Sequence, residues 1–300
     1  MADVAVIVPT FERAATIEAS VASVLGERDV SIEVVVVDDG STDDTVARLQ
    51  RMDDARLRVL ARPHAGIAAS RNAGVAASSA RYVAFHDSDD LALPGRLARP
   101  VRYLDQHPDC AFVVQNGRML PAAGAADATA EPWIEPRVAA RLCARPLGVA
   151  EVFRWNLGQL QGMCFTRRAL DATGPMDPAF RILDDLDLVL RVSTCFAGTF
   201  LDEVAFEYRR GGGVARDRTR IHEEAILVAE KLVSAHPQAR AAIGERTFRR
   251  RQARRYARLA RARRAAGDLR GARAAIDGAC RMAPLDLRYR MAALVIGRRS

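Results

Sequence analysis

The sequence predicts an α/β protein with a mostly parallel sheet flanked by helices, followed by an all-α, basic C-terminal extension. Over the first 85 residues, short valine-rich apolar runs alternate with segments of helical periodicity. This alternation is typical of βαβ units, whose right-handed crossovers make the strands parallel. In the last 55 residues, by contrast, alanine and arginine dominate. We therefore expect a sheet domain over residues 1–215 and an α-helical, arginine-rich region over residues 216–300.

The apolar runs are expected to be strands buried on both faces, because apolar residues follow one another without polar interruption. We expect strands at Val4–Val8, where Pro9 closes the run, and at Val34–Val37, Leu57–Leu60, Tyr82–Phe85 and Cys110–Val114. We expect helices at Ala14–Leu25, 43–52 and Gly66–Ser78. These elements form a Rossmann-like half of the sheet.

The loop after the first strand has no glycine cradle for phosphates. Pro9–Arg13 lacks the spacing G-x-G-x-x-G, and no G-x-x-x-x-G-K-[ST] occurs in the chain. The dinucleotide fingerprint and the P-loop are therefore absent. A nucleotide bound here would be held by side chains and by stacking on Phe11.

The stretch Arg81–Asp90, RYVAFHDSDD, ends an apolar strand in a cluster of carboxylates at Asp87, Asp89 and Asp90. Ligands of open α/β sheets lie outside the carboxyl ends of the strands. Carboxylates at that edge suit a hard divalent cation, which can bridge phosphates. The alternative is a solvated turn that caps the next helix, because Asp and Ser are common in both settings.

A second acidic loop, Asp38–Thr45, follows the second expected strand. Ser41, Asp43 and Asp44 are expected to cap the following helix. Asp39 precedes these residues and lies at the end of a strand, so we expect it to bind a ligand.

Charge is distributed unevenly along the chain. The net charge is +8, but residues 246–300 hold seventeen arginines and three aspartates, which leaves the first 245 residues with a net charge of −6. Attraction to anionic partners is therefore expected of the tail.

The five cysteines are scattered and never spaced CxxC, which favours reduced cytosolic thiols over a zinc site. No run is long enough for a membrane span, and the start does not resemble a signal peptide.

The tail is expected to contain three helices. They are placed at Arg249–Ala266, Leu269–Met282 and Asp286–Ile296, with a break and cap at Gly267 and Asp268. The spacing of Ala272, Ala279 and Pro284 resembles half of one tetratricopeptide unit. One such unit cannot bury its own apolar face. We therefore expect it to pack on the sheet domain or on another subunit, which allows a homo-oligomer through the C-terminal helices.

Four motifs in order carry a resemblance to a known family. They are VIVPTFERAATIEASVASVL, EVVVVDDGSTDDT, HAGIAASRNAGVAAS and YVAFHDSDDLALPGRL. Together they resemble the successive motifs of family 2 glycosyltransferases, which have a GT-A fold. A weaker match continues through GMCFTRRALDATGPMDPAF and ILDDLDLVLRV to about residue 213. The resemblance implies that residues 1–215 are the catalytic domain of an inverting, nucleotide-sugar-dependent enzyme.

The resemblance also implies roles for single residues. Asp87-Ser88-Asp89 resembles the DxD motif, in which Asp89 binds the metal and Asp87 touches the metal shell or the donor ribose. The other nucleotide-sugar-binding residues that it implies are Pro9, Thr10, Phe11 and Glu12 for base and ribose, Asp39 for the base, and Arg71 for the diphosphate charge.

The implied catalytic base is the second member of an acidic pair. Asp184 and Asp185 begin an expected helix, where the helix dipole favours carboxylates. The pair resembles the Glu-Asp or Asp-Asp of the family, which makes Asp185 the base and Asp184 a candidate contact for the acceptor. Trp155 is a further candidate for the acceptor groove, although a lone Trp is more often packed.

The implied reaction transfers a sugar from a nucleoside diphosphate donor, UDP-sugar first among them, to a hydroxyl of a glycan or lipid-linked acceptor. It uses Mn²⁺ or Mg²⁺ and belongs to cell-envelope or polysaccharide biosynthesis. The alternative is a non-catalytic nucleotide-sugar-binding or scaffolding protein that acts through its basic helical tail. Nucleic-acid binding is not expected, because the tail lacks interleaved aromatic residues.

The basic stretch 246–264 contains ten arginines and no acidic residue. Like charges at i,i+4 disfavour an isolated helix, so something anionic is expected to compensate them. One candidate is an anionic membrane surface, which implies a cytoplasmic protein bound peripherally to the inner face of the membrane. The other is a solvated helix docked on the acidic body.

Overall fold

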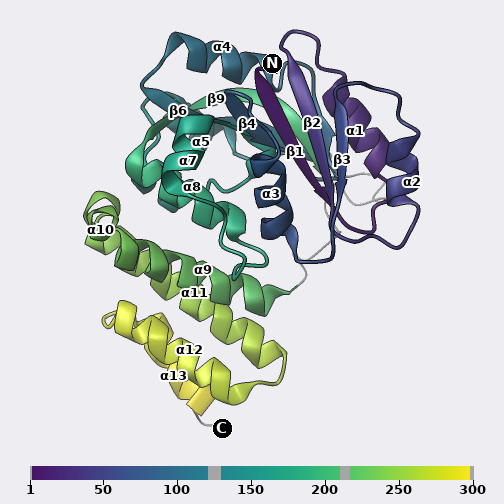
Figure 1. Cartoon of the computed structure of the whole chain (residues 1–300). Coiled ribbons are helices and arrows are strands. Elements are labelled where there is room, and N and C mark those ends of the chain that lie inside the picture. Colours follow the sequence, from purple (N-terminus) through teal and green to yellow (C-terminus); the bar gives the residue numbers. More distant parts are fainter. Residues whose placement is uncertain (1, 121–129, 210–216, 298–300) are drawn as a thin grey trace. The chain divides into compact units, whose positions relative to one another are not determined.

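The computed structural model describes residues 2–120, 130–209 and 217–297 (Figure 1). The chain divides into two compact units. The first comprises Met1–Gly148 and Leu157–Gly211, and the second comprises Val149–Asn156 and Gly212–Ser300.

The first unit contains the sheet and the helices that cover it. Its strands are β1 (Val4–Thr10), β2 (Ile32–Asp38), β3 (Leu57–Ala61), β4 (Tyr82–Phe85), β5 (Leu91–Ala92), β6 (Cys110–Leu120), β7 (Glu131–Pro132), β8 (Met163–Thr166) and β9 (Ala197–Arg209). Its helices are α1 (Ile17–Leu25), α2 (Thr45–Gln50), α3 (Ile67–Ala76), α4 (Ala98–Gln106), α5 (Pro136–Cys143), the 3-10 turn η1 (Leu160–Gly162), α7 (Arg167–Thr173) and α8 (Asp184–Cys195).

The strands form one sheet in the order β3-β2-β1-β4-β8-β6-β9-β5, and β7 pairs with β6. β3, β2, β1 and β4 are parallel, as the βαβ alternation predicts. Beyond β4 the sheet becomes mixed, because β8 runs antiparallel to both β4 and β6. The predicted α/β class, with a sheet flanked by helices and an all-α extension, is confirmed. The sheet was predicted to be mostly parallel, and it is parallel from β3 to β4 but mixed as a whole.

The sheet is covered on both faces, which explains its unbroken apolar strands. Val6, on one face of β1, belongs to a core cluster with Val21 of α1. Ile7 points to the other face, where α3 approaches so closely that a Cβ on Gly74 would lie 2.4 Å from Ile7 Cγ2. Helix α3 can therefore pack at this depth only because position 74 is glycine.

The first strand is longer than predicted, because Pro9 lies inside β1 and pairs with Val37 of β2. On the other side of β1, pairing with β4 ends at Ile7, opposite Phe85. The backbone beyond Ile7 therefore has a strand neighbour on one side only. Proline, which lacks an N–H group, is tolerated at such a position.

The second unit is helical. Its helices are α6 (Val149–Trp155), α9 (Arg218–Ala235), α10 (Pro237–Ile243), α11 (Glu245–Ala265), α12 (Leu269–Met282) and α13 (Leu287–Gly297). The predicted break after α11 is confirmed: Gly267 has φ 83°, and the Asp268 carboxylate accepts a hydrogen bond from Gly271 N at 2.8 Å.

These helices bury an apolar core of their own, made largely of alanine. Ile226 of α9 packs with Ala257 and Ala260 of α11 and with Ala272 and Ile276 of α12. The C-terminal helices were expected to pack on the sheet domain or on another subunit, but this core is shared with α9 of the same unit. In the part of the chain that the structure describes, no helix is both long and apolar enough to cross a bilayer.

Candidate active site

The loops that follow β1, β2 and β4 meet at the carboxyl edge of the parallel strands, where ligands of open α/β sheets bind. The loops after β1 and β2 are joined by hydrogen bonds. Glu12 N donates to Ser41 Oγ at 2.9 Å, and the Glu12 carboxylate accepts from Thr42 N at 2.8 Å. Glu12 has a positive φ of 52°, so this tight turn is maintained by its contacts with the next loop.

Thr10, the last residue of β1, and Phe11, which follows it, each have a side-chain group available to a ligand. Thr10 is buried, and its hydroxyl has no hydrogen-bond partner in the described part of the chain. The Phe11 side chain is exposed, and its ring centroid lies 4.6 Å from that of His64. Pro9 precedes both inside β1. An unpaired hydroxyl at Thr10 and an exposed ring at Phe11 suit a nucleoside, and this role stays a prediction.

The Asp39 carboxylate is held by the start of α3. It accepts hydrogen bonds from Ala65 N at 3.0 Å, Gly66 N at 2.8 Å and Ser70 Oγ at 3.0 Å. His64 Nδ1 lies 2.9 Å from its second oxygen. Asp39 therefore fastens the end of β2 to α3, and its contact with a nucleobase stays a prediction.

The helix caps after β2 differ in part from those that the sequence predicted. Asp43 accepts a hydrogen bond from Thr45 N at 3.0 Å and does cap the start of α2. Asp44 occupies the N-cap position but makes no capping bond with its side chain. Ser41 does not cap either, because its hydroxyl donates to Asp38 Oδ1 at 2.5 Å. The expectation for Asp44 and Ser41 was wrong. The Ser41 hydroxyl accepts its hydrogen bond from Glu12 N of the β1 loop instead of from the start of α2.

The DSDD turn after β4 is anchored by its backbone. Thr16 Oγ1 donates to Ser88 O at 2.9 Å, and Ser20 Oγ donates to Asp87 O at 3.0 Å. Ser88 itself is buried. The α1 segment thus fixes the turn, while the side chains of Asp87 and Asp89 remain 29% and 40% exposed.

Arg71 is a buried cation that pairs with two carboxylates of the site. Its guanidinium is buried, with Nη2 at 2.9 Å from Asp87 Oδ1 and Nη1 at 2.9 Å from Asp184 Oδ2. Burial alone would lower its pKa, but the carboxylates of Asp184 and Asp87 outweigh this effect and raise it. Arg71 therefore neutralises two carboxylates from distant parts of the chain and brings the DSD turn next to the start of α8.

Asp185 follows Asp184 in the first turn of α8 and is partly exposed. Its Oδ1 accepts a hydrogen bond from Leu186 N at 2.6 Å. Burial, together with the neighbouring charge of Asp184, raises the pKa of Asp185 to about 8. A carboxylate with this pKa exchanges a proton near neutral pH, which suits a general base.

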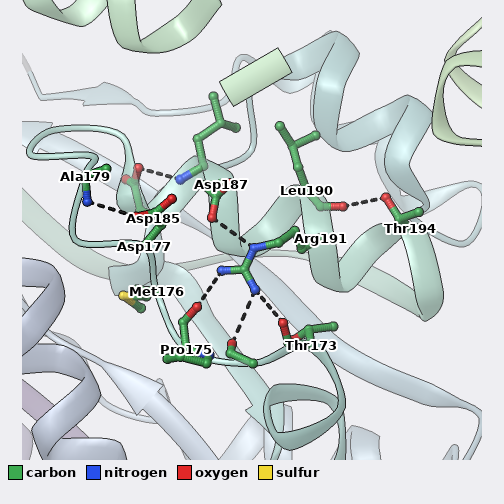
Figure 2. A network of polar contacts seen from close by, with 12 residues as sticks. Thr173, Pro175, Met176, Asp177, Ala179, Asp185, Asp187, Leu190, Arg191 and Thr194 are labelled. Carbon is green, nitrogen blue, oxygen red and sulfur yellow. Dashed lines mark hydrogen bonds and ion pairs between the residues drawn. The ribbon is translucent and has the colours of Figure 1, made fainter. Parts of the chain in front are cut away.

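A second arginine fixes the position of α8 (Figure 2). Arg191 Nε donates to Asp187, one helical turn earlier, at 2.9 Å. The rest of its guanidinium donates to the carbonyls of Thr173 at 2.6 Å and Pro175 at 2.9 Å. The loop after α7 is thereby tied to α8, so the acidic pair at the start of this helix has a fixed position.

Three residues to which the motifs assigned no role take part in the site. Gln161 Nε2 donates to Asp90 Oδ2 at 2.8 Å and also to Asp87 Oδ2, so one amide joins two carboxylates of the turn. Arg13 Nε lies 3.5 Å from Asp89 Oδ2. Arg96, behind the turn, donates to Gln161 O at 2.7 Å. Gln161 lies in an irregular segment with no periodic pattern, so only the fold could assign it.

The residues of the turn after β4 meet the requirements of a divalent cation only in part. No group of three or more His, Cys, Asp or Glu side chains in the described residues could hold a metal. Asp87 and Asp89 supply two carboxylates, and Mg²⁺ is commonly held by one or two carboxylates plus substrate phosphates. Burial, followed by the charge of Asp87, raises the pKa of Asp89. This excess of negative charge is what a cation would relieve.

Trp155 ends α6 and is partly exposed. It belongs to the second unit, and its role as an acceptor contact stays a prediction.

All five cysteines are free thiols.

Comparison with known proteins assigns the class. Residues 5–139 match the model of the family "Glycosyl transferase family 2". The chain is 39% identical over 104 residues to the succinoglycan biosynthesis protein ExoO of Rhizobium meliloti, which covers 34% of this chain and 30% of that protein. It is 36% identical over 95 residues to WfgD of Escherichia coli, a UDP-Glc:α-D-GlcNAc-diphosphoundecaprenol β-1,3-glucosyltransferase, covering 31% of this chain and 38% of that protein. The chain thus spans about a third of the length of these relatives.

Two solved structures have a similar fold. TarS 1–349 of S. aureus superposes with a TM-score of 0.64 at 16% identity, covering 94% of this chain and 81% of that one. The mannosyltransferase PcManGT of Pyrobaculum calidifontis, in complex with GDP-Man and Mn²⁺, gives 0.62 at 19% identity, covering 99% and 84%. Residues 5–139 are therefore similar to family 2 glycosyltransferases, and the fold of the chain is of the GT-A type.

Proposed function

We propose that the protein is an inverting glycosyltransferase that transfers a sugar from a nucleoside diphosphate, with UDP as the first candidate, to a hydroxyl of a glycan or lipid-linked acceptor. The observation that carries this proposal is the Arg71 bridge between Asp87 and Asp184. It sets carboxylates suited to a cation beside Asp185, a carboxylate suited to a base. The printed names of WfgD and PcManGT, which act on or bind nucleotide sugars, support the donor class.

Asp185 is the proposed base. Its raised pKa lets it take a proton from an acceptor hydroxyl near neutral pH as the oxygen attacks the anomeric carbon. The bond from that carbon to the diphosphate oxygen breaks as the new bond forms on the opposite face, which inverts the configuration. Placement at the start of α8 favours the carboxylate that must exist before each turnover.

Asp87 and Asp89 are the proposed holders of Mn²⁺ or Mg²⁺, which when bound offsets the negative charge of the leaving diphosphate. Thr10 and Phe11 are the proposed contacts of the nucleoside, and Asp39 keeps the adjoining loop in place. The structure of PcManGT with Mn²⁺ supports the cation.

The acceptor class and the location follow from the relatives and are proposals. ExoO is named for succinoglycan biosynthesis, and WfgD acts on a diphosphoundecaprenol-linked sugar. We therefore place this protein in polysaccharide or cell-envelope biosynthesis, at the cytoplasmic face of a membrane.

A panel of nucleotide sugars tests the proposal. Each is incubated with the protein and Mn²⁺, and mass spectrometry measures hydrolysis or transfer to an added acceptor. We expect one donor to be consumed by the natural protein and to be bound, but not consumed, by Asp185→Asn. Binding of a donor by both proteins without turnover, across acceptors, would favour the non-catalytic alternative.

A further inference from the structure

Helix α11 carries more positive charge than the described chain neutralises. It contains ten arginines and a single acidic residue, Glu245. Among the described residues, only Arg249 and Arg263 of these arginines lie within 4.0 Å of a carboxylate. Two of the others are not simply solvated: Arg251 is partly buried and Arg255 is almost fully buried within the helical unit.

Arg251 and Arg255 face the same aromatic ring. Their guanidinium carbons lie 5.7 Å and 4.8 Å from the centroid of Phe153, which stacks on Phe248 at 5.6 Å. Arg251 also donates to the carbonyl of Arg154 at the end of α6. These contacts account for the position of Arg251, because a cation stabilises both an aromatic face and the C-terminal end of a helix.

For Arg255, the contact with the Phe153 ring positions the guanidinium but does not satisfy its hydrogen-bond donors. This side chain belongs to a residue only 6% exposed, and its Nη1 donates to Gln252 Oε1 at 3.0 Å. Its Nη2 is buried without a hydrogen-bond partner in the described part of the chain. A buried guanidinium nitrogen with no acceptor is costly, so an acceptor is expected from outside the described residues.

The neighbouring charges have the same sign. Burial, followed by Arg251 and Arg258, lowers the pKa of Arg255 to about 9. Burial, followed by Arg254 and Arg258, lowers the pKa of Arg251 to about 10. On α9, burial and then Arg258 lower the pKa of His222. Among the residues that the structure describes, no carboxylate is a cause of either shift, so within that part of the chain the cluster has no counter-ion.

We propose that Arg251, Arg255 and Arg258 form a binding site for a phosphate or diphosphate group on the helical unit. The planar guanidinium presents paired donors that match phosphate oxygens, and several of them around a compact anion would satisfy Nη2. Arg258 is exposed and has no carboxylate partner among the described residues, so it is available to a ligand. The phosphate comes either from a soluble compound or from an anionic lipid headgroup.

Calorimetric titration of the full chain with inorganic pyrophosphate tests the site. A chelator is present throughout, so that cation-dependent binding at Asp87 and Asp89 does not contribute. We expect Arg258→Gln and Arg255→Gln to weaken binding by about 10- to 100-fold, as loss of a charge-assisted hydrogen bond does. The matched control is Arg246→Gln, which removes the same charge from an exposed position on another face of α11 and is expected to change affinity less than about 3-fold.

Sedimentation with vesicles distinguishes the two sources of phosphate. Vesicles of phosphatidylcholine, with or without phosphatidylglycerol, are incubated with the same variants, whose melting curves verify folding. Pyrophosphate binding that Arg258→Gln weakens indicates a soluble phosphate compound. Binding to phosphatidylglycerol vesicles alone, lost in Arg258→Gln and kept in Arg246→Gln, indicates a lipid headgroup. No binding of either probe, or equal losses in Arg258→Gln and Arg246→Gln, would overturn the proposal.

Discussion

Arg71 Nη1 lies 2.9 Å from Asp184 Oδ2, although the two residues are 113 positions apart in the chain. The same guanidinium binds Asp87 through Nη2, so it joins the turn after β4 to the start of α8. Both carboxylates belong to the candidate site, and both depend on one buried cation. Stability and function of the site are therefore expected to change together when Arg71 is replaced.

Replacement Arg71→Met is expected to lower the free energy of unfolding by about 3–5 kcal/mol, because it leaves two carboxylates without their cation. Arg71→Lys keeps the charge but loses the two-pronged geometry, so a smaller loss is expected. Urea denaturation measures both. The control is Arg81→Gln, which breaks exposed ion pairs with Asp3 and Asp105 and is expected to cost at most about 1 kcal/mol. Equal losses at positions 71 and 81 would contradict a special role for the buried network.

Asp89→Ala is expected to abolish transfer and to remove the effect of Mn²⁺ on UDP affinity. The reason is that Asp89 is the more exposed of the two carboxylates offered to a cation. Calorimetric titration of UDP, with Mn²⁺ and with a chelator, measures this difference without relying on turnover. Asp109→Asn, at an exposed position of the α4–β6 turn, is the control and is expected to behave as the natural protein. Full activity in excess chelator would rule out a cation on Asp89.

Asp185→Asn is expected to lower turnover by about 10²–10⁴-fold, the range for a lost general base, while donor affinity is kept. Because the pKa of Asp185 is raised to about 8, kcat/KM of the natural protein is expected to rise with pH up to about 8 as the carboxylate forms. If Asp184→Asn removed activity and Asp185→Asn did not, the base would be Asp184.

The same raised pKa predicts a dependence of stability on pH. A carboxyl whose pKa is higher in the folded state than the ordinary 3.8 contributes stability that is fully present below about pH 4. That contribution is lost as the pH rises through about 8. Asp185→Asn mimics the protonated form, so its melting temperature is expected to exceed that of the natural protein by more at pH 9 than at pH 6. A constant difference at both pH values would contradict the raised pKa.

Much of the fold follows from local pattern. β4 begins and ends at Tyr82 and Phe85 as predicted, because four apolar residues are bounded by polar ones. β6 was predicted to end at Val114 but continues to Leu120. The apolar run stops at Gln115 and Asn116, yet both are buried, and the Asn116 side chain exchanges hydrogen bonds with the backbone of Ile134. A buried amide satisfied from another segment cannot be recognised in a single strand.

The sequence predicted carboxylates after a strand and at the start of a helix, and the structure has Asp89 in the turn after β4 and Asp185 in the first turn of α8. The roles of both stay predictions. The internal contacts of the site could not be predicted. The Asp39 side chain was expected at a ligand, and the structure places it against the backbone of Ala65 and Gly66 at the start of α3. Likewise, nothing near Gln161 in the sequence indicates that its amide meets Asp87. Such contacts depend on chain segments that only the sheet topology brings together.

Gln161 of η1 contacts two carboxylates of the turn after β4. It is buried, and its amide nitrogen is the donor that separates the carboxylates of Asp87 and Asp90. Gln161→Glu replaces that donor with a third carboxyl group, whose pKa is expected to be raised by burial and by its two neighbours. Stability from the protonated form is then present at low pH and lost as the pH rises.

We therefore expect Gln161→Glu to unfold at a lower urea concentration than the natural protein at pH 8, and the difference to shrink at pH 5, where the carboxyl is protonated and can donate. Gln161→Leu is the matched control, because it lacks the donor at every pH and its deficit should hardly change. Affinity for UDP with Mn²⁺ is a second readout, since a misplaced Asp87 would weaken it while a merely structural role would leave it unchanged. Equal deficits of Gln161→Glu at pH 5 and pH 8 would show that the amide does not act by separating the two carboxylates.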